Sequence, residues 1–165
     1  MAVRQYSADD FAHYRDIRLE SLTADPGSFG STHEREAAFD EDMWRARLTG
    51  LGGRPAATFV DEVDGRAIGT AGVAYTEHDP EPMLIGMWVR PADRGLGSGK
   101  RLVEAAVAWA QGRGAAEILL WVVNDNLAAI KLYERSGFVA SGRVEALNSN
   151  PCSDALEMRL DLGRG

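Results

Sequence analysis

Hydrophobic residues recur at helical spacing in the first third of the chain. A short strand is predicted at residues 2–6, and Ser7 with Asp10 then comes close to a capping box at the start of a helix. Residues 25–27 end that helix, and Asp40 is placed to cap a second one. The positions that recur at helical spacing are Phe11, Tyr14, Ile17, Arg18 and Leu22 in the first helix, and the second helix bears Met43, Trp44, Arg47 and Leu48.

The pattern then changes from helical periodicity to strands. Residues 57–63 and 67–75 are predicted to be two strands, joined by the hairpin signal Asp64-Gly65. Residues 83–90 are mostly apolar, which is typical of a central strand, and Pro91 ends them. We therefore expect an antiparallel pair followed by a strand in the middle of a sheet.

Helices and strands alternate in the second half of the chain. The predicted elements are, in order, a helix at 102–110, a strand at 118–123, a helix from 124–126 to 136–137, and strands at 138–143 and 156–162. This order indicates an α/β fold with a mixed sheet. The chain has 165 residues and no evident linker, so we expect one domain over residues 1–165.

Charge and composition exclude several classes of protein. The net charge is −7, which disfavours nonspecific binding to nucleic acid or to an anionic membrane. The longest apolar runs, 105–110 and 118–123, are far shorter than the ~20 residues that cross a bilayer. Three scattered histidines and the single Cys152 give no metal-ligand pattern. We expect a cytoplasmic protein without a metal.

A glycine-rich turn at residues 94–100 is the strongest candidate for a ligand site. Gly95, Gly97 and Gly99 lie between a strand and a helix, where free N–H groups and the helix dipole favour an anion such as phosphate. A P-loop would need glycine at position 94 and Ser or Thr at position 101, but both residues are arginines. A dinucleotide-binding loop would need glycine or alanine at position 100, where Lys100 stands. From the residues alone, a tight structural connection is as good an explanation as a ligand.

Two motifs resemble those of the GCN5-related N-acetyltransferases. Arg94-Gly95-Leu96-Gly97-Ser98-Gly99 matches the Arg/Gln-x-x-Gly-x-Gly/Ala loop of that family and follows an apolar strand, as it does there. A second block, from Asn124-Asp125-Asn126 to Leu132-Tyr133 and Ser136-Gly137-Phe138, is similar to the family's second cofactor motif. The resemblance covers roughly residues 57–162, in the same order of elements.

The resemblance implies a fold and a cofactor. It implies a single-domain, mostly antiparallel mixed sheet of about six or seven strands with about four helices, splayed between strands 83–90 and 118–123. It also implies acetyl-CoA, with pyrophosphate on the loop and pantetheine beside the splayed strand. The residues implied to bind it are Met87, Trp88, Val89, Arg94, Gly95, Leu96, Gly97, Ser98, Gly99, Lys100, Asn126 and Tyr133.

Catalytic roles are implied for two residues. Tyr133 matches the tyrosine that protonates the leaving thiolate in the family, although aromatic packing alone would also explain it. The strand 83–89 has no Asp or Glu where several members carry a base, so Glu81 at its entrance is the first candidate, ahead of residues 77–79. Phe29 and Trp44 are candidates for the acceptor pocket.

The function that these motifs imply is acetyl transfer from acetyl-CoA to a primary amine of a small molecule or peptide, by direct attack. A non-catalytic CoA or acyl-CoA sensor is the alternative, because the strand carboxylate is missing. A nucleotide-dependent enzyme is a third possibility. The net charge of −7 favours a cationic acceptor without identifying it, and family members often form dimers, so a homodimer is possible.

Overall fold

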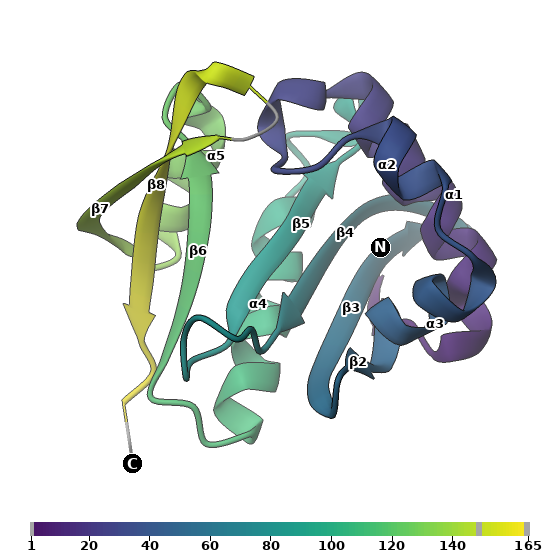
Figure 1. Cartoon of the computed structure of the whole chain (residues 1–165), viewed down its shortest axis with the longest axis horizontal. Coiled ribbons are helices and arrows are strands. Elements are labelled where there is room, and N and C mark those ends of the chain that lie inside the picture. Colours follow the sequence, from purple (N-terminus) through teal and green to yellow (C-terminus); the bar gives the residue numbers. More distant parts are fainter. Residues whose placement is uncertain (1, 148–149, 164–165) are drawn as a thin grey trace.

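The computed structural model describes residues 2–147 and 150–163. In order along the chain, the elements are β1 (Ala2–Gln5), η1 (Ala8–Asp10), α1 (Phe11–Ala24), η2 (Pro26–Ser28), α2 (His33–Ala37), α3 (Glu41–Thr49), β2 (Gly50–Leu51), β3 (Arg54–Val63), β4 (Arg66–Ala74), β5 (Met83–Val89), η3 (Pro91–Asp93), α4 (Ser98–Gly112), β6 (Glu117–Val123), α5 (Leu127–Arg135), β7 (Val139–Leu147) and β8 (Asn150–Asp161). These elements form one layer of strands with helices on both faces (Figure 1).

The strands form one mixed sheet in the order β1-β3-β4-β5-β6-β8-β7, with the short β2 paired to β3. Every pair is antiparallel except β5 with β6. The expected α/β fold with a mostly antiparallel mixed sheet is confirmed.

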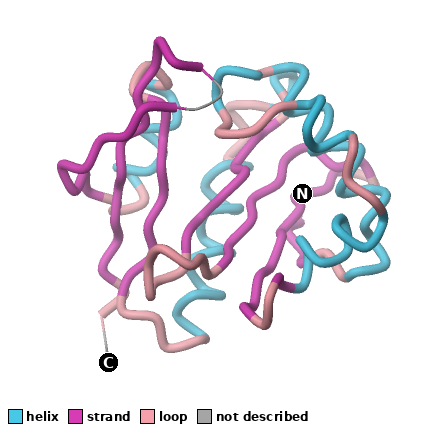
Figure 2. The backbone as a smooth tube through the Cα atoms, in the orientation of Figure 1, coloured by secondary structure: helices cyan, strands magenta, loops and turns pink. Residues whose placement is uncertain are grey.

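The two central strands pair only where they begin. β5 and β6 are in register at Met83 with Leu119 and at Leu84 with Leu120, and no further pair follows among the described residues. Figure 2 shows the two strands separating toward one end of the sheet. The expected splay is therefore present, and the second half of β5 has β4 as its only strand neighbour among the described residues.

Alternating side chains of the strands fill a core on each face of the sheet. On one face α4 packs across β3, β4 and β5, and Tyr133 of α5 joins the same cluster. On the other face α1 and α3 pack through two smaller clusters that include Trp44 and Trp88. Since neighbouring residues of a strand point to opposite faces, β5 presents Met87 to the α4 side and Trp88 to the α1 side.

Two differences from the expected elements have simple causes. α2 was not anticipated because five residues give no periodic pattern; it begins where the Thr32 side chain accepts the amide of Arg35 at 3.2 Å. The last two strands are longer than predicted, and β7 and β8 pair through Leu147 and Asn150. β7 is exposed along almost its whole length, so it lacks the apolar alternation that would have marked its end.

Candidate active site

A bulge distorts β5 where it leaves β6. Gly72 of β4 opposes Ile85 and Thr70 opposes Trp88, so β5 carries one residue more than β4 between these pairs. Gly86 lies in this segment with φ of +60°, a conformation that residues with a Cβ rarely adopt. Such a bulge re-aims the backbone and side chains beside it, here at Met87.

Beyond the bulge, backbone groups of β5 face the gap. Arg90 donates its amide to the Ile68 carbonyl of β4 at 2.7 Å, so strand alternation turns the amide and carbonyl of Val89 away from β4. The Val89 carbonyl accepts Nε of Arg94 at 2.9 Å. The Val89 amide is thereby left facing the space between the two central strands.

The glycine-rich turn ends in a helix N-terminus without a side-chain cap. α4 begins after Gly97, whose φ of +85° is left-handed, and among the described residues no side chain caps it. The first helical hydrogen bond runs from the Arg101 amide to the Gly97 carbonyl, which leaves the amides of residues 98–100 for a ligand. Ser98 Oγ is buried and has no hydrogen-bond partner in the described chain.

Two arginines hold this turn in place. Arg101 donates to the fully buried carboxylate of Asp61 at 2.7 Å and to the Leu96 carbonyl at 3.0 Å. Arg94 donates to Asp25 at 2.9 Å, and the indole Nε1 of Trp88 donates to the same Asp25 oxygen at 2.7 Å. The turn is therefore tied to β3 on one side and to the end of α1 on the other.

Gly99 leaves room for side chains of α5 and β5 that pack against the start of α4. A Cβ at this position would lie 2.9 Å from Leu132 Cδ2 and 3.2 Å from Met87 Cε. Gly99 thus lets α5 approach α4, whereas the conformational demand of the turn falls on Gly97.

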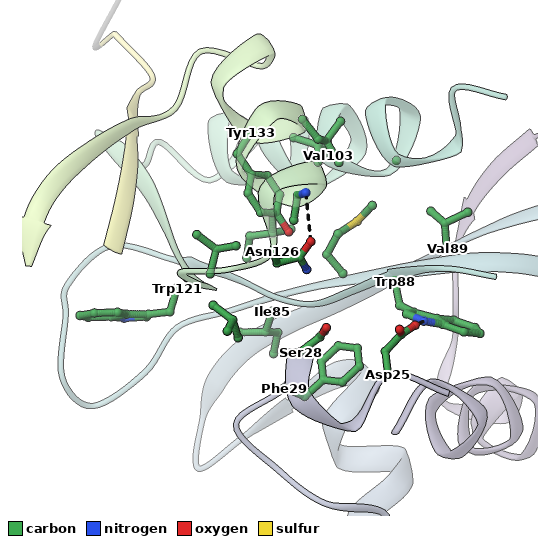
Figure 3. Close-up of a pocket in the computed structure, with 18 of the residues that line it drawn as sticks. Asp25, Ser28, Phe29, Ile85, Trp88, Val89, Val103, Trp121, Asn126 and Tyr133 are labelled. Carbon is green, nitrogen blue, oxygen red and sulfur yellow. Dashed lines mark hydrogen bonds between the residues drawn. The ribbon is translucent and has the colours of Figure 1, made fainter. Parts of the chain in front are cut away.

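One cavity of about 1,740 Å³ joins these features. It runs from the glycine turn along β5 and opens toward the segment after α1. Figure 3 shows Tyr133 and Asn126 on one side of it and Ser28 and Phe29 on the other. Of the residues predicted to bind the cofactor, those that line it are Met87, Trp88, Val89, Arg94, Gly95, Gly97, Ser98, Gly99, Lys100, Asn126 and Tyr133. Leu96 is 54% exposed and is not among the lining residues.

Tyr133 is the buried residue of α5. Its ring packs edge-on against Phe138, with 5.9 Å between centroids, and burial raises the pKa of its phenol above the ordinary value of 10. The phenol is therefore protonated at neutral pH, although burial makes it a weaker acid than a phenol in water. Asn126 caps α5 by accepting the Ala129 amide at 3.3 Å through Oδ1, which leaves its Nδ2 on the cavity side (Figure 3).

The structure does not bring Glu81 or Trp44 to the cavity. Glu81 lies just before the start of β5, at the closed end of the strand pair, where its Oε2 accepts the amides of Ala116 and Glu117 at 3.1 and 3.2 Å. This role is structural, and the alternative carboxylates Glu77 and Asp79 form ion pairs outside the cavity. Trp44 is 1% exposed in the core between α1, α3 and β3.

The cavity has a charged cluster that the sequence reading missed. The carboxylate of Glu36 accepts Nε and Nη2 of Arg18, both at 2.9 Å, and Nη1 of Arg47 at 2.5 Å. Burial would raise the pKa of Glu36, but the hydrogen bonds from Arg18 and the charges of both arginines outweigh it and lower this pKa from 4.5 to about 2. Phe29 lies over the Arg18 guanidinium at 4.8 Å.

No metal centre is evident in the described part of the chain. Within residues 2–147 and 150–163, no group of three or more His, Cys, Asp or Glu is arranged to hold an ion. In the same residues, no helix has the length and apolar content needed to span a membrane.

Comparison with known proteins identifies a family. The sequence model of the acetyltransferase (GNAT) family matches residues 15–138. Streptothricin acetyltransferase from Streptomyces lavendulae is 35% identical over 91 residues, and a mycothiol acetyltransferase from Thermomonospora curvata is 32% identical over 108 residues. These matches take in 55% and 64% of this chain but 48% and 35% of the relatives, so the chain spans at most about half of their length.

Solved structures agree on the fold. The yncA protein of Salmonella typhimurium, solved with its cofactor acetyl-CoA, superposes with a TM-score of 0.78 at 21% identity, covering 100% of this chain and 95% of that one. A GCN5-related N-acetyltransferase from Kribbella flavida gives a TM-score of 0.76 at 21% identity, covering 97% and 96%.

The Glu36 cluster gives a prediction about stability and pH. Because the pKa of Glu36 is lowered on folding, its contribution is complete above the ordinary value of 4.5 and is lost as the pH falls toward 2. A shift of this size corresponds to about 3 kcal/mol. Glu36→Gln should therefore lower the free energy of unfolding by about 3 kcal/mol at pH 7, with the same deficit down to about pH 5 and a smaller one from there toward pH 3.

Urea denaturation of both proteins between pH 7 and pH 3 measures this difference. Glu104→Gln is the matched control, since Glu104 is 61% exposed and its ion pair with Lys100 is 3.9 Å long. A deficit for Glu36→Gln that does not shrink with falling pH would contradict the assigned pKa.

Proposed function

Because this chain belongs to the acetyltransferase (GNAT) family, we propose that it transfers the acetyl group of acetyl-CoA to a primary amine. One observation carries the proposal. A single cavity contains the gap between β5 and β6, the uncapped start of α4 and the protonated phenol of Tyr133. These are a channel for a thioester arm, a phosphate site and a proton donor.

The residues present suit acetyl-CoA, which supplies the acetyl group as a thioester. The amides of residues 98–100 and the N-terminal dipole of α4 attract the pyrophosphate, and the exposed Lys100 adds a positive charge. Arg94 and Arg101 brace the turn through Asp25 and Asp61.

The second half of β5 binds the pantetheine arm. The Val89 amide faces the gap that β6 leaves, and Nδ2 of Asn126 can donate from the opposite side. The bulge at Gly86 turns the backbone next to Met87 and Trp88, where an N–H can stabilise the oxyanion that forms on the thioester carbonyl.

The reaction is a direct displacement. The amine nitrogen attacks the thioester carbonyl carbon, the new C–N bond forms and the C–S bond breaks, and the Tyr133 phenol gives its proton to the departing thiolate. We call the part of the cavity next to α1 and α2 the acceptor side. Its two carboxylates, Asp25 and Glu36, both form ion pairs with arginines. We therefore assign the removal of the amine proton to water.

The acceptor is a small-molecule or peptide amine, in line with the streptothricin and mycothiol acetyltransferases that this chain resembles. We infer that the enzyme works in the cytoplasm, since the single Cys152 allows no disulfide within the chain. We also propose a homodimer that pairs through the open edge of β7, where Val139 and Val144 are 69% and 53% exposed.

Tyr133→Phe tests the proton donor. The variant keeps the ring contact with Phe138 but loses the hydroxyl, so we expect kcat to fall by about 10²-fold while the Kd for acetyl-CoA stays within about twofold. Release of free thiol measures the rate, and calorimetry measures binding. Tyr75→Phe is the control, because Tyr75 packs on Trp109 outside the cavity. A fully active Tyr133→Phe enzyme would remove Tyr133 from the mechanism.

Gly97→Asp tests the phosphate site. An Asp side chain brings a negative charge to the mouth of α4 and strains a residue with φ of +85°, so the Kd for acetyl-CoA should rise at least about tenfold. Gly112→Asp carries the same charge at the other end of α4, where a Cβ meets open space, and should bind normally. Equal affinities in the two variants would show that the turn does not hold the pyrophosphate.

A further inference from the structure

Arg18 is a buried arginine with part of its donor capacity unused. It lies in the middle of α1 and is 7% exposed. Nε and Nη2 donate to the two oxygens of Glu36, but Nη1 is buried and has no hydrogen-bond partner among residues 2–147 and 150–163. Leaving a buried charged donor unsatisfied costs more than the ~1–3 kcal/mol of a neutral group, so such a group calls for a partner.

The free nitrogen points at the distorted part of β5. A Cβ built on Gly86 would lie 3.4 Å from Nη1 of Arg18, which places this nitrogen against the backbone of the bulge. Arg18 and Gly86 both line the main cavity, and the following residues, Met87 and Trp88, are those assigned to the oxyanion. Arg18 therefore lies in the wall of the cavity on the acceptor side, with Nη1 packed against the bulge beside the residues assigned to the oxyanion.

The geometry around Arg18 is rigid. Phe29 covers one face of the guanidinium at 4.8 Å, and the two hydrogen bonds to Glu36 fix its plane. A planar fork of N–H donors held in this way suits a carboxylate.

Local charge on this side of the cavity is the opposite of the charge of the whole chain. Arg18 and Arg47 share the single carboxylate of Glu36, and Arg35 lines the same region, whereas Asp25 is already bound by Arg94. The cluster keeps an excess of positive charge in a chain whose net charge is −7. A polycationic acceptor would be repelled here, and an anionic group would be attracted.

We propose that the acceptor is an amino acid, or a small amine of the same kind, whose carboxylate is bound by Nη1 of Arg18. The inference rests on the proposed acetyl transfer and specifies its substrate. The carboxylate takes no part in the bond changes; it holds the molecule so that its amine faces the thioester carbonyl. Because Nη1 lies directly beside the bulge, only a few atoms separate the carboxylate from the amine.

Matched substrates test this directly. The twenty L-amino acids are each assayed with acetyl-CoA beside their carboxamides, which keep the side chain and the amine but lose the charge. We expect kcat/KM to be about ten- to a hundredfold higher for the acid of the preferred pair, the factor that a hydrogen bond to a charged group provides. Carboxamides have more unprotonated amine at neutral pH, so this preference cannot come from amine basicity.

Variants of Arg18 assign the preference to this side chain. Arg18→Lys keeps the charge but loses the fork, and Arg18→Gln removes the charge while its amide can still donate to Glu36. In both, the acid-to-carboxamide ratio should fall by at least about tenfold, while acetyl-CoA still raises the unfolding midpoint. Arg15→Lys is the matched control on α1, since Arg15 is 45% exposed and, within residues 2–147 and 150–163, its ion pair is with the exposed Asp16.

The outcomes separate this inference from the proposed function. If acetyl-CoA binds and carboxamides react as well as acids, or if no amino acid reacts, the carboxylate site is wrong and the acetyl-CoA site stands. An unchanged ratio in folded Arg18→Lys overturns the role of Arg18. Transfer from succinyl-CoA in preference to acetyl-CoA would assign the free nitrogen to an anionic acyl group and would also overturn it. If acetyl-CoA neither binds nor reacts, the proposed function itself fails.

Discussion

The site depends on the point at which β5 and β6 stop pairing. Two residue pairs, at Met83 and Leu84, hold the strands together, and beyond them the edge of β5 is free to bind something other than a strand. An unpaired strand edge inside a protein would leave buried N–H and C=O groups without partners. The bulge at Gly86 adds to this demand, because it turns backbone groups out of the pairing with β4. We propose that a thioester arm lies along β5, satisfies these groups and is thereby aligned for reaction.

The two ends of the gap are built for different chemistry. At one end Gly97 turns the chain into α4 and leaves amides for phosphate, while Asp61 and Arg101 fasten the turn to β3. At the other end α1 and α2 bring Arg18 and Glu36 against the bulge. The first end uses mainly backbone groups, which suit a ligand common to a whole family. The second uses side chains from the first third of the chain, where a particular acceptor can be selected.

Sequence reasoning succeeded where local signals were strong. The strand, glycine turn and helix around Gly97 were predicted from their own residues, and the resemblance supplied the splay that periodicity alone could not give. It did less well where the outcome depended on distant parts of the chain. Glu81 was the first candidate for the base because it stands at the entrance of strand 83–89. In the fold, however, its carboxylate accepts the amides of residues 116 and 117. Arg18 was read as one more position on a helical stripe, because its partner Glu36 is on a helix too short to predict. The net charge of −7 favoured a cationic acceptor, whereas the cavity brings Arg18, Arg35 and Arg47 together with the single carboxylate of Glu36.

A crystal structure of the protein with CoA tests the central claim most directly. The account predicts that the pantetheine arm lies beside residues 85–89 of β5 in the gap left by β6, with the Val89 amide donating to it. It also predicts the pyrophosphate on the amides of residues 98–100. CoA bound elsewhere, or a complex in which β5 and β6 close the gap between them, would contradict the account.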